Sequence, residues 1–118
     1  MVYMATRKSA IAVIRWSARI WGTGAALVWG AFFVEHLAWF SGGSATPLRV
    51  WLEQGLHFAM VAGLLAAWRY ERVAGAVALV ASIVFFASAA GPRFWPFVAS
   101  TVPPALAFIY CGTRSAAR

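Results

Sequence analysis

The chain has 118 residues, of which 63% are hydrophobic and 11% are charged, whereas a soluble globular domain has about 45–50% apolar and about 25% charged residues. This leaves too little polar material for the surface of a soluble fold, so the composition predicts one domain embedded in a lipid bilayer. A net charge of +7 is compatible with a protein that binds nucleic acid, but the basic residues lie in small groups between apolar runs. We therefore expect no nucleic-acid partner.

Residues 1–19 precede the first long apolar run and carry the basic side chains Arg7, Lys8, Arg15 and Arg19. They form a cytoplasmic or interfacial segment, either an amphipathic helix among the headgroups or an extension of the first span. The next part, 20–112, contains four apolar runs. Each is close to the length of about 20 helical residues that is needed to cross ~30 Å of hydrocarbon. The predicted spans are 20–40, 50–70, 73–90 and 94–112, and residues 113–118 form a cytoplasmic tail.

The breaks between these spans contain glycine and proline. The sequence SGGSATP, residues 41–47, is a loop that ends in proline, and Gly91–Arg93 is a tight break. Pro103 and Pro104 fall inside the last span. Proline removes a backbone donor, so a bend is expected there, and the freed carbonyls must find partners in neighbouring helices or water.

Basic residues are distributed unequally between the two ends of the spans. Only Arg49 and Arg93 lie on one side. The other side holds Arg7, Lys8, Arg15, Arg19, Arg69, Arg72, Arg114 and Arg118. The positive-inside rule then places both termini in the cytoplasm. The prediction is an all-α fold, an antiparallel bundle of four transmembrane helices in the cytoplasmic membrane, with both ends inside.

Small residues recur at every fourth position in two of the spans. Membrane helices pack closely where small residues line one face. The first run consists of Ala18, Gly22, Ala26 and Gly30, and the second consists of Gly55, Ala59, Gly63 and Ala67. A weaker run follows in Ala74, Ala78 and Ser82. We expect the first two runs to face each other, with dimerisation through one of them as the alternative.

Ionisable and amide side chains gather at one level of the predicted bundle. The members are Glu35, His36, Glu53, Gln54 and His57, with Arg49 and Arg93 just above them as potential ion-pair partners. At ~1.5 Å per residue all five lie within about 10 Å of the outer hydrocarbon boundary. At ~100° per residue, Glu53 and His57 point away from the Gly55–Ala67 face, toward the third and fourth spans or another subunit.

Three interpretations of this cluster stay open. In the first, the carboxylates pair with the arginines or histidines and serve structure alone. The second is a haem or divalent-metal site with His36 and His57 as ligands. The third is a proton or ion path through the Glu and His side chains. No nucleophile elbow, phosphate-binding loop or HExxH motif is present, so we predict no enzyme activity and no cofactor outside the second interpretation.

Three stretches together resemble a known group of proteins. They are RWSARIWG (residues 15–22), AWRYERVAG (67–75) and PALAFIYCG (104–112). The chain resembles a family of short bacterial four-helix membrane proteins of unknown function, which implies the same topology and no known activity. Within the second stretch, Glu71 lies between Arg69 and Arg72 and is expected to form local ion pairs with them.

The function expected from the sequence is that of a small, multi-pass, non-catalytic membrane protein. It acts as an accessory or interaction subunit of a larger membrane complex, or as a homo-oligomer, with the bilayer as its surroundings. The alternative is a haem-binding, metal-binding or proton- or ion-conducting protein that uses Glu35, His36, Glu53 and His57.

Overall fold

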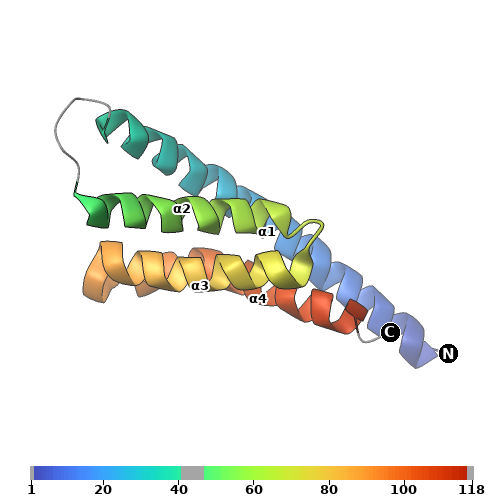
Figure 1. Ribbon diagram of the computed structural model, residues 1–118. Coiled ribbons are helices and arrows are strands. Elements are labelled where there is room, and N and C mark those ends of the chain that lie inside the picture. The colour runs from blue at the N-terminus through green and yellow to red at the C-terminus, as the bar shows by residue number, and fades with distance from the viewer. Residues whose placement is uncertain (1, 41–46, 117–118) are drawn as a thin grey trace.

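The computed structural model describes residues 2–40 and 47–116, and these form four α-helices and one short 3₁₀ helix. The elements in chain order are α1 (Val2–Phe40), α2 (Leu48–Ala66), α3 (Glu71–Ala90), η1 (Gly91–Arg93) and α4 (Trp95–Ala116). The prediction of an all-α four-helix bundle is confirmed (Figure 1).

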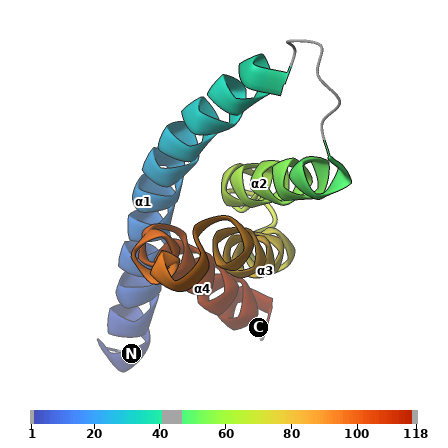
Figure 2. The same cartoon turned by 90° about the vertical axis from the view of Figure 1, so that its left-hand side faces the viewer.

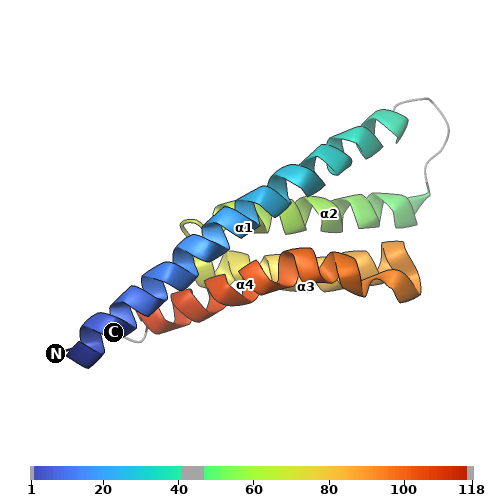
Figure 3. The same cartoon turned by 180° about the vertical axis from the view of Figure 1, so that it is seen from behind.

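Helices α2, α3 and α4 lie side by side, and the long helix α1 crosses them at an angle (Figures 1 and 2). The most extensive contacts are those of α3 with α4 and with α2. Both termini and the α2–α3 turn lie toward one end, here called the junction end (Figure 3). Toward the far end, where α1 ends and α2 begins, α1 separates from the other helices. Helix α1 therefore lies close to the other helices at the junction end and diverges from them toward the far end.

Proline and glycine mark several of the helix boundaries. Residues 7–19 belong to the same uninterrupted helix as 20–40, and α1 contains no proline over its 39 residues. Helix α2 begins after Pro47, and α3 ends where Gly91 adopts a φ of +60°, a conformation that other residues rarely take. Residues 41–46 of the predicted loop lie outside the described residues.

Helix α4 continues through Pro103 and Pro104 without a break. Pro104 has no N–H to donate to the carbonyl of Ser100, four residues earlier. That carbonyl instead accepts a hydrogen bond from Nε1 of Trp21 on α1, at 2.9 Å. A second tryptophan, Trp29, donates its Nε1 to the Ser100 hydroxyl at 3.0 Å. A neighbouring helix thus supplies a partner for a carbonyl freed by proline, as predicted.

The prediction that the small-residue faces of α1 and α2 pack against each other is wrong for most of their length. A Cβ added at Gly63 of α2 would lie 3.0 Å from the Ala74 oxygen and 3.0 Å from the Ala78 nitrogen, both in α3. Gly55 has open space around it, and Ala59 lies beside α3. The reason is that the small residues of α3 allow an equally close approach, so α2 packs against α3.

The small face of α1 lies in the groove between α2 and α4. A Cβ added at Gly22 would meet Phe108 and Pro104 of α4 at 3.2 and 3.6 Å, and Leu64 of α2 at 3.8 Å. Ala26 is buried with Leu64 and Ala105, and Gly30 faces Val61. The two predicted faces meet at one point, where Ala18 and Ala67 share a buried cluster with Ala74 and Phe108.

One described segment, Glu71–Arg93, is by itself long and apolar enough to cross a membrane, with a mean hydropathy of 2.3. Glycines, tryptophans and ionisable residues lower the hydropathy of α1 and α2. A core helix of a soluble protein passes the same test of length and composition. The four predicted spans therefore remain a prediction.

Candidate functional site

The far end brings together the two histidines predicted to share a level. The ring centroids of His36 and His57 are 6.5 Å apart. His57 is 1% exposed, donates from Nε2 to the Trp29 carbonyl at 2.8 Å, and packs against Phe85 with ring centroids 4.6 Å apart. His36 donates from Nδ1 to the Phe32 carbonyl at 2.8 Å. Both imidazoles are thus tied to the backbone of α1.

The acidic and basic members of the predicted cluster do not form one network. Oε1 of Glu53 accepts a hydrogen bond from the Ser88 hydroxyl of α3 at 2.7 Å, and Nε of Arg49 lies 3.4 Å from the same oxygen. The Arg49 pair was among those predicted, but 77% of that side chain is exposed, so the pair contributes well under about 1 kcal/mol. Over residues 2–40 and 47–116, Glu35 and Arg93 form no ion pair, so the pairing of Arg93 that the first interpretation allowed is not found there.

Two buried polar atoms at the far end have no hydrogen-bond partner in the described part of the chain. They are Nε2 of Gln54, a residue that is 7% exposed, and Nδ1 of His57. Among the described residues, no group of three or more His, Cys, Asp and Glu side chains is arranged to hold a metal ion. His36 and His57 are the histidines available to the haem or metal interpretation, and Nε2 of His57 is already engaged.

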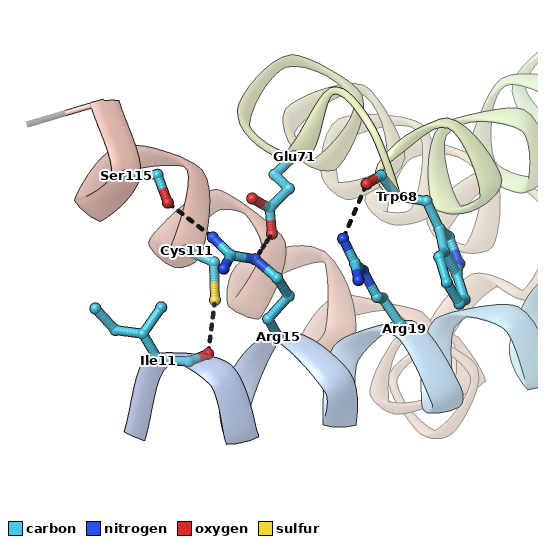
Figure 4. A network of polar contacts seen from close by, with 7 residues as sticks. All are labelled: Ile11, Arg15, Arg19, Trp68, Glu71, Cys111 and Ser115. Carbon is cyan, nitrogen blue, oxygen red and sulfur yellow. Dashed lines mark hydrogen bonds and ion pairs between the residues drawn. The ribbon is translucent and has the colours of Figure 1, made fainter. Parts of the chain in front are cut away.

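The junction end holds a network that the sequence analysis did not predict (Figure 4). Nε of Arg15 on α1 lies 2.7 Å from Oε2 of Glu71, the first residue of α3. Nη2 of Arg15 donates to the Ser115 hydroxyl of α4 at 2.7 Å. The expected local pairs of Glu71 with Arg69 and Arg72 are wrong, because the Glu71 side chain turns inward, where 13% of it is exposed.

The Arg15–Glu71 pair joins helices distant in sequence. The hydrogen bond to Glu71 raises the pKa of the Arg15 guanidinium above its ordinary value. Hydrogen bonds to charged partners contribute about 1.5–3 kcal/mol when they are shielded from water. Since one guanidinium contacts both α3 and α4, Arg15 fixes the position of α1 on the bundle.

Arg19 lies one helical turn beyond Arg15 and caps the end of α2. Its guanidinium carbon is 4.9 Å from the ring centres of both Trp16 and Trp68, and its Nη2 donates to the Trp68 carbonyl at 3.2 Å. Nε1 of Trp68 donates in turn to the Thr23 hydroxyl at 2.9 Å. A carbonyl left over at a helix end thus receives a donor from α1.

The backbones also approach closely at this end. A Cβ added at Gly112 of α4 would lie 2.7 Å from the backbone nitrogen of Arg72, and one at Gly75 of α3 would lie 3.1 Å from the Ala105 oxygen. The three stretches that carry the family resemblance therefore meet here. The first two supply the Arg15–Glu71 and Arg19–Trp68 contacts, and all three supply members of the buried cluster around Phe108. These stretches encode the junction between helices.

A shallow groove runs along α2 and α3. It consists of two adjoining hollows of about 410 and 420 Å³. Ala59 and Val77 line both hollows, and most of the other lining residues are alanine, glycine or valine. Part of the second predicted small-residue face thus remains accessible from outside.

This architecture defines an all-helical four-helix protein with a polar junction at one end. The chain belongs to the family described as a domain of unknown function, DUF7670, whose model matches residues 6–113. No curated protein and no solved structure matches the chain. The matched residues include Arg15, Glu71 and the two far-end histidines, and the family description assigns an activity to none of them.

Proposed function

We propose that this protein is a small multi-pass protein of the bacterial cytoplasmic membrane that acts without catalysis, as an accessory subunit of a membrane complex or as a homo-oligomer. The observation that carries the proposal is the apolar exterior of every helix. Leu27 of α1, Phe58 of α2, Val80 of α3 and Leu106 of α4 are 69%, 60%, 60% and 51% exposed. In water such a surface promotes aggregation, whereas in lipid it needs no cover.

The positions of the charges and the helix lengths support the same proposal. Helices α2 and α3 have 19 and 20 residues, which corresponds to about 28–30 Å and matches the hydrocarbon core. Arg15, Arg69, Arg72 and Arg114 lie toward the junction end, which the positive-inside rule places in the cytoplasm. Both termini then face the cytoplasm.

Membrane extraction and reporter fusions test the insertion. The protein should stay in the membrane pellet after an alkaline carbonate wash. A C-terminal green fluorescent protein should fluoresce, and a C-terminal alkaline phosphatase should be inactive. Release into the supernatant, or phosphatase activity without fluorescence, would contradict the proposal.

The groove along α2 and α3 is the proposed contact surface, because small residues let another helix approach closely in lipid. Ala62 lines the groove, so Ala62→Leu should fill it. Ala87 of α3 is exposed and lies outside both hollows, so Ala87→Leu is the matched control. Native gels of mild-detergent extracts should show a complex that Ala62→Leu dissociates and Ala87→Leu leaves intact. A wild-type monomer, or equal behaviour of the two variants, would argue against this surface.

The second candidate function is haem or metal binding or proton or ion conduction by Glu35, His36, Glu53 and His57. The proximity of the two imidazoles and the unpartnered Nδ1 of His57 favour it. A Soret band, stoichiometric metal in purified protein, or pH-dependent flux in liposomes that is lost in Glu53→Gln and His57→Phe would establish it. Colourless, metal-free protein without flux would remove it.

A further inference from the structure

A crevice of about 380 Å³ opens at the far end, where α1 separates from α3 and α4. Trp29, Phe85, Phe86 and Phe97 line its floor, and His36 and Arg93 also line it. The crevice lies apart from the α2–α3 groove, with which it shares no lining residue. It is therefore a separate candidate site.

The floor of the crevice is aromatic, and its polar groups are already engaged. Trp29 packs edge-on against Phe86 with ring centroids 4.9 Å apart, and Phe86 stacks on Phe97 at 5.8 Å. Nε1 of Trp29 donates to the Ser100 hydroxyl, which donates to the Phe97 carbonyl at 2.6 Å. The floor thus offers ring surface to an apolar ligand.

The charged groups around the crevice favour an anion. Arg93 is exposed and pairs with no carboxylate within the described ranges. No acidic residue lines the crevice. The Glu53 carboxylate already accepts a hydrogen bond from Ser88 and pairs with Arg49. A guanidinium binds a carboxylate through two parallel hydrogen bonds, so a planar carboxylate complements this rim.

The volume limits the size of the ligand. Ligand sites span about 300–1,000 Å³, so a crevice of about 380 Å³ is near the lower limit. One hydrocarbon chain suits this space better than the two chains of a phospholipid. We propose that the crevice binds a long-chain carboxylate, with its chain against Trp29, Phe85, Phe86 and Phe97 and its carboxylate on Arg93.

Binding of radiolabelled palmitate to the full chain in a maltoside detergent tests this inference. Saturable binding to one site is expected. Hexadecanol, which lacks the carboxylate, should compete about tenfold less well, or worse. Equal competition by hexadecanol, equal or better competition by phosphatidylglycerol, or the absence of saturable binding would overturn the proposal.

Two pairs of variants locate the site. Arg93→Gln should weaken palmitate binding about tenfold or more, whereas Arg49→Gln, at the same end but outside the crevice, should leave it unchanged. Ala89 lines the crevice and Ala87 does not, so Ala89→Leu should weaken binding and Ala87→Leu should not. Equal effects within either pair would contradict the assignment, and circular dichroism checks that each variant is folded.

This inference rests on the proposed membrane location, because long-chain carboxylates concentrate in lipid. The two tests remain separable, since palmitate binding is measured in detergent and insertion is measured by carbonate extraction. A protein that stays in the membrane pellet but binds no palmitate would overturn the crevice alone.

Discussion

The two ends of this bundle are built differently. At the junction end, Arg15 contacts both Glu71 and Ser115, and glycines such as Gly112 bring backbones together. At the far end, α1 diverges from α3 and α4, a crevice lies between these helices, and Nδ1 of His57 is buried without a described hydrogen-bond partner. The comparison indicates that the junction end holds the helices in place, while the far end leaves room for a ligand.

The largest expected effect on stability comes from placing a side chain where the backbones of α2 and α3 approach closely. Gly63→Leu should destabilise the protein by about 3 kcal/mol, because even a Cβ there would touch Ala74 and Ala78 at 3.0–3.1 Å. Gly55→Leu, on the same helix with no atom within 4 Å, should cost little. Thermal unfolding in detergent, followed by circular dichroism, compares the two. Similar melting temperatures would show that the α2–α3 contact is not close.

The next effect concerns the junction ion pair. Arg15→Met should cost about 2 kcal/mol, because it leaves the partly buried Glu71 carboxylate without its strongest donor. Arg69→Met should cost much less, since its guanidinium lies over the exposed Tyr70 ring. In a double-mutant cycle measured by thermal unfolding, Glu71→Gln should couple to Arg15→Met and not to Arg69→Met. Coupling to Arg69 instead would restore the local pairing expected from the sequence.

A smaller effect is expected at the prolines of α4. Trp21→Phe should destabilise the protein by about 1 kcal/mol, because it removes the donor to the Ser100 carbonyl that Pro104 leaves free. Pro104→Ala supplies a backbone N–H to that carbonyl, so Trp21→Phe should cost less in the Pro104→Ala background. Unfolding midpoints of the four proteins measure this difference, and an unchanged cost would disprove the link.

The smallest effect is expected for an exposed pair at the far end. Arg49→Gln should change the free energy of unfolding by less than about 0.5 kcal/mol, because Arg49 is 77% exposed and lies 3.4 Å from Glu53. The same unfolding measurement checks it. A loss comparable to that of Arg15→Met would mean that the two ends are equally constrained.

Local features of this fold were predictable from the sequence, and rotations between helices were not. Long apolar runs and the glycine and proline breaks predict the four helices, and the fixed rise of a helix places His36 and His57 at one level. The pair of Arg49 with Glu53 follows from an i,i+4 spacing.

The partner of Glu71 depends on how α1 is rotated relative to α3. This partner, Arg15, lies 56 positions before Glu71 in the sequence. One signal was present, since Arg15 and Arg19 share a helix face and Glu71 is the acidic residue of the basic end. Likewise, small residues on three helices left the partner of Gly63 undetermined.

Hydrogen exchange along α1, followed by mass spectrometry of the full chain in detergent, tests the contrast between the two ends most directly. Backbone amides of residues 11–26 should exchange more slowly than those of 27–38, and Arg15→Met should speed exchange in 11–26 while leaving residues 50–58 of α2 unchanged. Uniform exchange along α1, or slower exchange in 27–38, would contradict a helix that is held at the junction end and open at the far end.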